Sequence, residues 1–270
     1  MIACMNMTPG IIRLLACSLV ALTGLFAQLP APNAQGISMG HLHLFVSDVD
    51  AMKKFFVGIM GAETVHSGRL EALKLPGVII VLTKSTPSGG TDDSAVNHLG
   101  FLTPNLADMR AKLTAAGGKV VREMPDTHQM FVMFPDGVKV EFTEQKDLKV
   151  PIVHHHVHFF TNDVEATRAW YVKHFGAVPG KRGRFEAADV PGVNLTFSPN
   201  PTATLPTKGR SVDHIGFEVK GLEAFCKKLE AQGVNFDTPY RHVPAINLGI
   251  AFLTDPFGVR VELTEGLNTL

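Results

Sequence analysis

The sequence predicts an α+β fold, a tandem duplication in which each copy pairs two modules of one strand, one helix and several further strands. Segment 40–63, GHLHLFVSDVDAMKKFFVGIMGAE, returns as segment 155–178, HHVHFFTNDVEATRAWYVKHFGAV, with equivalent residues 115 positions apart. In both, a short alternating apolar segment precedes a stretch with helical periodicity. Because each copy also repeats the pattern within itself, the chain is expected to contain four similar modules.

Later segments extend the duplication to the end of the chain. AVNHLGFLTPNL (95–106) resembles SVDHIGFEVKGL (211–222), and MFPDGVKVEFTE (133–144) resembles LTDPFGVRVELTE (253–265). Between the copies lies QKDLKVP, which is charged and ends in proline, as interdomain linkers often do. The sequence therefore predicts domains at residues 38–145 and 152–266.

The helices carry signals at both ends. Asp48, Asp163 and Asn105 stand at N-cap positions, where their side chains can accept a backbone N–H. The first predicted helix ends at Gly61, which suits the left-handed C′ position. Its apolar stripe has the spacing of an amphipathic helix and consists of Met52, Phe55, Phe56, Ile59 and Met60. Trp170 and Tyr171, in a later helix, are interpreted as core residues.

Composition excludes several classes of partner. The chain has 270 residues, 45% of them apolar and 19% charged, as in a packed globular protein. Lys+Arg and Asp+Glu both count 25, and basic residues form no cluster, so we expect no nucleic-acid partner.

Residues 1–30 are predicted to be a signal peptide. Arg13 precedes the apolar run 14–26, LLACSLVALTGLF, which is shorter than the approximately 20 residues of a membrane span. Cleavage is expected near Ala27, which gives an exported protein, periplasmic or secreted, with no stable membrane span after processing; a retained anchor helix is the alternative. Cys226 would then be the remaining cysteine and is interpreted as a small core residue.

Histidine and glutamate recur in a pattern that suggests metal ligands. Each copy has a histidine on its first strand, another on its middle strand and a glutamate on its last strand. We expect the ligands of each copy to converge as two sets: His41, His98 and Glu141, and His156, His214 and Glu262. Two imidazoles and one carboxylate suit Fe(II), Mn(II), Zn(II) or Ni(II) and leave coordination positions open. A lone strand histidine is more often structural, and Lys139 or Arg260 is the alternative partner for the nearby glutamate.

The stretch VHHHVHFF, residues 153–160, adds more imidazole than one metal requires. Strand periodicity places His154 and His158 on the face of His156, and His155 on the other face. His43 shares the face of His41 in the same way. These additional histidines are expected to contact substrate or to orient the ligands.

Together these motifs resemble the vicinal oxygen chelate superfamily, which includes glyoxalase I, extradiol dioxygenases and bleomycin resistance proteins. The resemblance is carried by a first-strand histidine seven residues before an aspartate, by FFVGIMG and WYVKHFG, by the H-[LI]-G-F strand and by a terminal glutamate after DG or DPFG. It implies paired βαβββ modules that curl into half-open sheets around a metal held by the six residues named above. It also implies a small-molecule substrate that chelates the metal through adjacent oxygens.

The sequence departs from glyoxalase I in one respect. Members like glyoxalase I usually add a second glutamate, but the matching segments GVIIVLT and GVNLTFS have no carboxylate. Two histidines and one glutamate are the set of extradiol dioxygenases, so Fe(II) and dioxygenase chemistry are preferred over lyase or isomerase chemistry. The expected acid–base residues are His242, Tyr240 and His128, in loops before the last strands; the first two favour the second copy if a single copy works. The alternative is a protein of the bleomycin-resistance type that sequesters a small molecule without turnover. A homodimer is compatible with either function.

Overall fold

The computed structural model describes residues 29–200, 202 and 204–270. The predicted signal peptide lies outside the described residues except for its last two positions, so it stays a prediction, and so does export. Within the described part of the chain, every helix is too short or too polar to span a bilayer.

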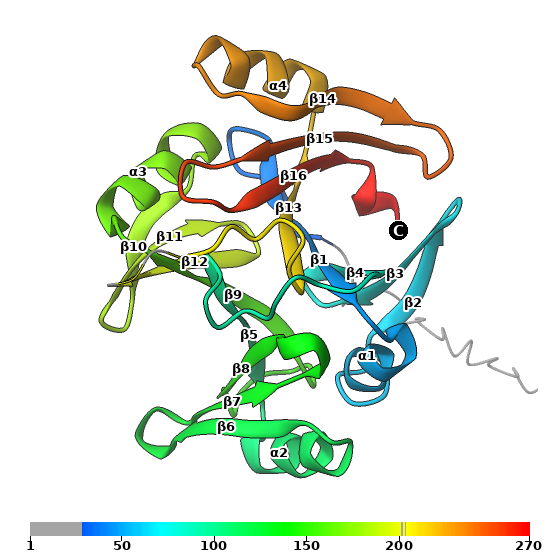
Figure 1. Ribbon diagram of the computed structural model, residues 1–270, viewed down its shortest axis with the longest axis vertical. Coiled ribbons are helices and arrows are strands. Elements are labelled where there is room, and N and C mark those ends of the chain that lie inside the picture. The colour runs from blue at the N-terminus through cyan, green and yellow to red at the C-terminus, as the bar shows by residue number, and fades with distance from the viewer. Residues whose placement is uncertain (1–28, 201, 203) are drawn as a thin grey trace, which may run out of the picture.

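Sixteen strands form two eight-stranded sheets, each built from two modules (Figure 1). The terminal sheet, formed by the first and last modules, has the order β14-β15-β16-β13-β1-β4-β3-β2. Its strands are β1 (Ile37–Val46), β2 (Glu63–Ser67), β3 (Leu70–Leu75), β4 (Val78–Lys84), β13 (Val212–Val219), β14 (Phe236–Val243), β15 (Leu248–Thr254) and β16 (Arg260–Glu265).

The middle sheet, formed by the second and third modules, has the order β10-β11-β12-β9-β5-β8-β7-β6. Its strands are β5 (Val96–Thr103), β6 (Lys119–Met124), β7 (Gln129–Met133), β8 (Lys139–Glu144), β9 (Val153–Thr161), β10 (Val178–Arg182), β11 (Phe185–Val190) and β12 (Val193–Pro199). The predicted fold class of paired βαβββ modules in curved sheets is confirmed.

Each sheet takes one module from each copy. β1 pairs antiparallel with β13, and β5 pairs antiparallel with β9. Inside every module the first and last strands pair in parallel, as β1 does with β4 and β9 with β12. The two copies are therefore joined strand to strand, and neither sheet belongs to one copy alone.

Four helices lie against the outer faces of the sheets: α1 (Val49–Phe56), α2 (Leu106–Ala115), α3 (Val164–Phe175) and α4 (Leu222–Ala231). The predicted N-caps are confirmed, because Asp48, Asp163 and Asn105 each accept a backbone N–H from three residues ahead. α1 ends at Phe56, earlier than its apolar stripe predicts. A turn follows, and Gly61, at φ +75°, ends that turn instead of the helix.

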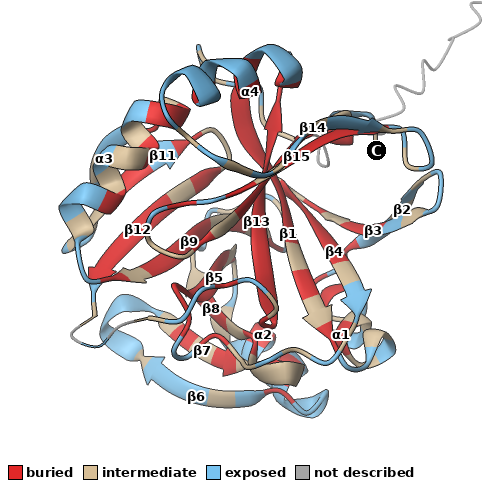
Figure 2. Ribbon diagram, turned by 45° about the horizontal axis from the view of Figure 1, so that its top comes forward, coloured by how far each residue is buried: buried red, intermediate tan, exposed pale blue. Residues whose placement is uncertain are grey.

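The main core lies between the helices and the outer faces of the sheets (Figure 2). Tyr171 is fully buried there, and its hydroxyl donates to Asp255 Oδ2 at 2.8 Å. Trp170 packs against the same core, and Cys226 is buried in it, as predicted. Since side chains alternate along a strand, the opposite, concave faces are left for the histidines and glutamates.

Candidate metal centres

Two clusters of potential metal ligands lie on the concave faces, one in each sheet. The terminal centre consists of His41, His43, His214 and Glu262, and the middle centre of His98, Glu141, His156 and His158. In each cluster the ligand atoms lie within 4.8 Å of one another. All are buried except His43, which is partly buried.

The structure keeps the predicted pairs of middle-strand histidine and last-strand glutamate. His98 Nε2 is 3.0 Å from Glu141 Oε2, and His214 Nε2 is 2.8 Å from Glu262 Oε2. In each pair, the histidine and the glutamate come from neighbouring parallel strands of one module. These strands are β5 and β8 in the middle sheet, and β13 and β16 in the terminal sheet.

The first-strand histidines are exchanged, so the predicted grouping within each copy is wrong. His41 Nε2 lies 2.9 Å from Glu262 Oε2, and His156 Nε2 lies 3.4 Å from Glu141 Oε2. The reason is topological: β1 joins β13 and β5 joins β9, so each first-strand histidine faces the ligands of the other copy.

A glycine makes room for each exchanged histidine. Gly100 lies opposite His156 in the sheet, and Gly216 lies opposite His41. A Cβ on Gly100 would lie 1.9 Å from Cε1 of His156, and one on Gly216 would lie 2.0 Å from Cε1 of His41. Only glycine fits, which explains the glycine two residues after the middle-strand histidine in H-[LI]-G-F.

Hydrogen bonding fixes which nitrogen of His98 faces the glutamate. The Asn97 side chain donates from Nδ2 to the Asp92 carbonyl at 3.2 Å, so its Oδ1 faces His98 Nδ1 at 2.9 Å and must accept. A neutral His98 therefore carries its proton on Nδ1 and presents the lone pair of Nε2 to Glu141 Oε2. A cation shared by these two acceptors, which lie 3.0 Å apart, would remove their repulsion.

The ionisation states suit that cation. Burial lowers the pKa of His156 to about 3 and also lowers the pKa of His98, so both imidazoles are neutral at pH 7. The Glu141 carboxylate accepts three hydrogen bonds on Oε1, from Gln129, Thr143 and Arg182, and these favour its ionised form. Neutral imidazole and ionised carboxylate are the forms that bind a divalent metal.

One further observation fits a metal at the middle centre. Within the described residues, the buried Nε2 of His156 has no hydrogen-bond partner, although it lies 3.4 Å from Glu141 Oε2. Leaving such a group unsatisfied costs about 1–3 kcal/mol. A divalent cation held by His98, His156 and Glu141 would satisfy all three ligand atoms, and this donor set fits Fe(II), Mn(II), Zn(II) or Ni(II).

The terminal centre is arranged in the same way, but an aspartate takes the place of Asn97 beside the histidine. His214 Nδ1 lies 2.6 Å from Asp213 Oδ2, an oxygen that can only accept, and Arg260 donates to that oxygen at 2.7 Å. His214 Nε2 therefore also faces its glutamate as an acceptor unless the ring is protonated. Burial opposes protonation, but the bonds to Asp213 and Glu262 win and raise the pKa of His214.

The second oxygen of Glu141 is held by three donors that the sequence analysis missed. Gln129 Nε2 donates to Oε1 at 2.7 Å, Thr143 Oγ1 donates at 2.9 Å, and Arg182 Nη1 donates at 3.3 Å. With Oε1 occupied, Oε2 is the oxygen left to face the histidines. Thr143 is detectable from the alternation of its strand, but Arg182 comes from a different strand with no motif of its own.

The additional histidines of β9 have separate roles. His158 Nε2 lies 2.7 Å from Ser198 Oγ and its Nδ1 lies 3.3 Å from Arg182 Nη2, at the wall of the cluster. His155, expected on the other face, reaches back so that its Nδ1 lies 3.0 Å from Nδ1 of His156. His154 is buried beside Phe101 and belongs to neither cluster.

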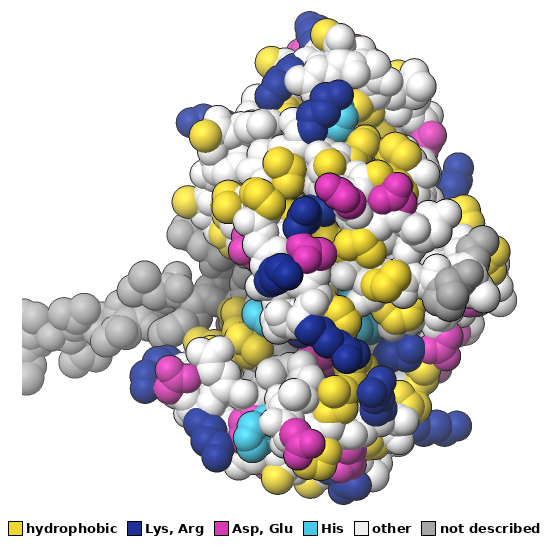
Figure 3. All heavy atoms as spheres, turned by 90° about the vertical axis from the view of Figure 1, so that its left-hand side faces the viewer, with side chains coloured by type: hydrophobic (Ala, Val, Ile, Leu, Met, Phe, Trp, Pro, Cys, Tyr) yellow, Lys and Arg dark blue, Asp and Glu magenta, His cyan; other side chains and the backbone are white. Residues whose placement is uncertain are grey.

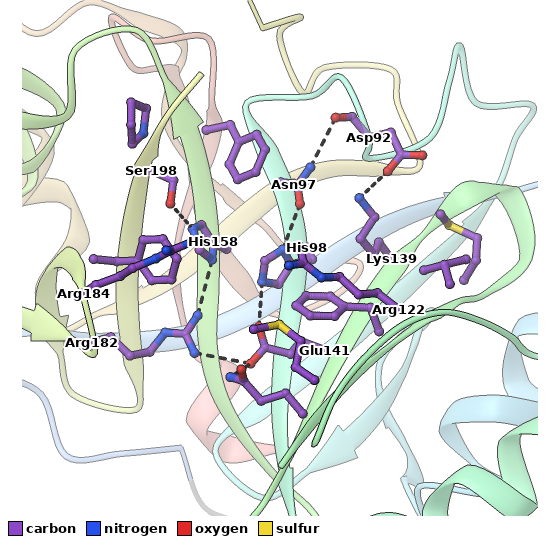
Figure 4. Close-up of a pocket in the computed structure, with 18 residues that line it drawn as sticks. Asp92, Asn97, His98, Arg122, Lys139, Glu141, His158, Arg182, Arg184 and Ser198 are labelled. Atoms are coloured by element: carbon purple, nitrogen blue, oxygen red, sulfur yellow. Dashed lines mark hydrogen bonds and ion pairs between the residues drawn. The ribbon is translucent and has the colours of Figure 1, made fainter. Parts of the chain in front are cut away.

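The middle centre opens into a cavity of about 860 Å³ (Figure 4). His98, Glu141 and His158 belong to its wall, and the remaining wall is mostly apolar or basic. Figure 3 views the molecule from the left-hand side of Figure 1 and shows basic side chains around visible histidine in the middle of this face.

The three predicted acid–base residues do not line this cavity. Tyr240 and His242 lie within β14 instead of a loop, and the ring of Tyr240 packs against the main core beside Gly249. His242 is exposed. His128 is also exposed, and its Nδ1 is 3.9 Å from Glu144, which caps α2. Alternation along β14 decides the positions of Tyr240 and His242, and a loop assignment gives no alternation. His128 lies in a turn, as predicted.

The chain is a duplicated set of βαβββ modules, and each of its two concave sheets brings together two histidines and a glutamate that could hold a metal ion. The chain belongs to the Glyoxalase/Bleomycin resistance protein/Dioxygenase superfamily, whose profile matches residues 38–142 and 154–263.

Solved structures show the same fold at low sequence identity. Glyoxalase I from Zea mays has a TM-score of 0.68 and 18% identity, over 86% of this chain and 93% of that chain. A putative dioxygenase from Bacillus subtilis subsp. subtilis str. 168 has a TM-score of 0.62 and 14% identity, over 88% of this chain and 86% of that one. A search of curated proteins gave no match.

Proposed function

We propose that the protein is a divalent-metal-dependent enzyme whose reactive centre is the middle centre, acting on a small substrate that chelates the metal through adjacent oxygens. The observation that carries the proposal is the fixed orientation of His98, whose Nε2 and the Glu141 carboxylate face one point on the wall of an open cavity. Three protein ligands leave positions open for substrate, as in catalytic rather than structural sites. Lewis-acid polarisation of the substrate oxygens is the chemistry that such a cation supplies.

The chain's own groups would orient the substrate and move protons. Arg182 spans Glu141 and His158 with one guanidinium, so it can stabilise negative charge that develops on a substrate oxygen. Burial holds the pKa of His158 well below its usual value, so the ring is neutral, and Nδ1, which accepts from Arg182, is the atom that would take a proton. His158 therefore replaces His128 and His242 as the proposed acid–base residue.

Dioxygenase chemistry with Fe(II) is preferred over lyase chemistry. A glyoxalase-I-like site would take a second carboxylate from the last strand of the third module. In β12 the residues that share the concave face with His156 and His158 are Asn194, Thr196 and Ser198. The remaining set of two histidines and one carboxylate is the ligand set of non-haem Fe(II) oxygenases.

Metal analysis and turnover together test this proposal. Protein reconstituted anaerobically with Fe(II), Mn(II), Zn(II) or Ni(II) would be assayed with a panel of catechols under O₂ and a panel of thiol–aldehyde adducts. His156→Ala is expected to lose one metal equivalent and all turnover, whereas the matched variant His41→Ala loses one equivalent and keeps turnover. Turnover that survives in His156→Ala and disappears in His41→Ala would refute the assignment to the middle centre.

One observation favours sequestration without turnover as a second candidate. Arg182 already gives Glu141 a positively charged partner, so part of the carboxylate's charge is balanced without a metal. In that case the purified protein would contain no metal after reconstitution, and adding Fe(II), Mn(II), Zn(II) or Ni(II) would not raise its melting temperature.

A further inference from the structure

We propose that the cavity over the middle centre selects an anion with an apolar body, and that Arg122 and Arg184 hold its negative charge at the mouth. The inference rests on the proposed function for the reaction that follows binding. The selection itself depends on the cavity walls and not on a metal.

The two arginines approach the cavity from opposite sides. Arg122 lies on β6 and Arg184 in the turn between β10 and β11. β6 and β10 are the two edge strands of the middle sheet, yet both arginines line the same cavity (Figure 4). Both side chains are exposed to solvent, as expected for residues at its mouth.

These guanidinium groups are the uncompensated charges of the cavity. Of its four basic wall residues, Lys139 is paired with Asp92 and Arg182 with Glu141. Among the described residues that form the wall, Asp92 and Glu141 are the only acidic ones. Within the described residues, Arg122 and Arg184 have no salt bridge, so the cavity carries an excess of positive charge that favours an anion.

The rest of the wall suits an apolar body. Phe185 lies under Arg184, with the guanidinium carbon 5.0 Å from the ring centroid, which keeps this charge above an aromatic surface. The apolar wall residues are Val121, Met124, Phe131, Met133, Phe160, Phe185 and Pro199. Guanidinium forks bind planar anions such as carboxylates through two parallel hydrogen bonds. A carboxylate or sulfonate on an aromatic or aliphatic body therefore matches the cavity.

The terminal sheet has only one of these arginines. Arg69 follows β2 as Arg184 follows β10, 115 residues later. Arg122 stands opposite Phe131, whereas Thr238 stands opposite the equivalent Phe252. Only the middle sheet therefore has an arginine on each side of its cavity to bind an anion. Arg69→Gln provides a matched control.

Two probes of the same shape test the proposal. 8-Anilinonaphthalene-1-sulfonate is an aromatic anion, and N-phenyl-1-naphthylamine is its uncharged analogue. In fluorescence titrations of metal-loaded and chelator-treated protein, we expect the anion to bind the cavity about tenfold or more tighter than the neutral probe. Arg122→Gln/Arg184→Gln should weaken binding of the anion by about tenfold and of the neutral probe by less than about twofold. Arg69→Gln should change neither affinity.

Three results would overturn the inference: equal affinities for the two probes, no saturable binding of either, or an equal loss of both in the double variant. Thermal unfolding of the same samples identifies a folding defect, and the single variants Arg122→Gln and Arg184→Gln then take the place of the double variant. Calorimetric metal titrations separate this inference from the proposed function. Lost charge selectivity with normal metal uptake refutes the anion site alone, and absent metal uptake with intact selectivity refutes the metal enzyme alone.

Discussion

In the middle sheet the cluster of histidines and glutamate borders a cavity of about 860 Å³, whereas in the terminal sheet the same cluster has only about 280 Å³ beside His43. The concave face of the terminal sheet is occupied by a second apolar cluster, which includes Ile79, Val81, Leu248, Ile250 and Leu267. The duplicated cluster of histidines and glutamate is therefore present in both sheets, but it borders a large cavity in the middle sheet alone among the described residues.

The ends of the terminal sheet also meet across its mouth. Ser67 Oγ donates to the Ile246 carbonyl at 2.5 Å, and Arg69 N donates to the Ala245 carbonyl at 3.1 Å. These bonds tie the β2–β3 hairpin to the β14–β15 hairpin. Ser67 occupies the position that Arg182 has in the middle sheet. Ser67 joins the two hairpins of the terminal sheet, whereas Arg182 contacts Glu141.

The side chains that contact the clustered histidines and glutamates also differ in charge between the two sheets. Asp213 supports His214 where neutral Asn97 supports His98. Glu141 accepts from Arg182, while the corresponding residue of the terminal sheet, Ser67, bonds elsewhere. Arg260 balances Asp213 in the terminal sheet, so the distinctive feature of the middle centre is a guanidinium, Arg182, in direct contact with the clustered glutamate.

The largest expected effect comes from removing the space for one imidazole. Gly100→Ala places a methyl group inside the ring of His156, and Gly216→Ala does the same to His41. Each variant should lose one metal equivalent, measured by elemental analysis. Only Gly100→Ala should lose activity, by about 100-fold or more, because a displaced ligand misplaces the substrate. Equal losses of activity in both variants would break the functional distinction between the sheets.

A second comparison concerns the turns before β8 and β16. Burial raises the pKa of Asp255 from its ordinary value of 3.8 to about 6, so the folded state binds a proton more tightly than the unfolded state. Stability from this group is complete below pH 4 and is lost as the pH rises towards 6. At 1.36 kcal/mol per pKa unit, the free energy of unfolding should fall by about 3 kcal/mol over that range.

Asp255→Asn should remove this fall, as measured by urea denaturation at pH 4, 5, 6 and 7. Asp136→Asn is the control, because Asp136 is partly exposed and binds Ser47 at the surface. An unchanged pH dependence in Asp255→Asn would show that another group is responsible.

A smaller effect is expected from the cation beside the middle centre. Arg182→Gln removes a positive charge that contacts Glu141 and His158, so a divalent metal should bind the middle centre more tightly. Solvent screening limits the gain to about tenfold. Competition with a fluorescent chelator in a His41→Ala background isolates that centre. Weaker metal binding in the Arg182→Gln protein would mean that Arg182 organises the ligands more than it repels the metal.

Local pattern predicted the modules and most of the histidines and glutamates that cluster, but not which of them cluster together. Asp48, Asp163 and Asn105 cap helices because capping is decided by a few neighbouring residues. Glu141 and Glu262 lie beside the histidines of their own modules because parallel pairing within a module is short in sequence.

Because the four modules are similar, the local sequence does not indicate which of their first strands pair with one another. β1 joins β13 and not β5, and only the assembled chain shows it. Arg182 was missed for a related reason, since it reaches Glu141 from the opposite half of the middle sheet. The sequence predicts Tyr240 and His242 near a metal because it assigns them to a loop. In a loop the direction of a side chain is not fixed, whereas in a strand each residue belongs to one of two faces.

The most direct test of the central claim, that each centre takes ligands from both copies, is the metal content of two double variants after reconstitution. His41→Ala/His214→Ala removes ligands of the terminal centre alone and should retain one equivalent of metal. His41→Ala/His98→Ala removes one ligand from each centre and should retain none. The reverse result, with one equivalent kept by His41→Ala/His98→Ala and none by His41→Ala/His214→Ala, would contradict the account.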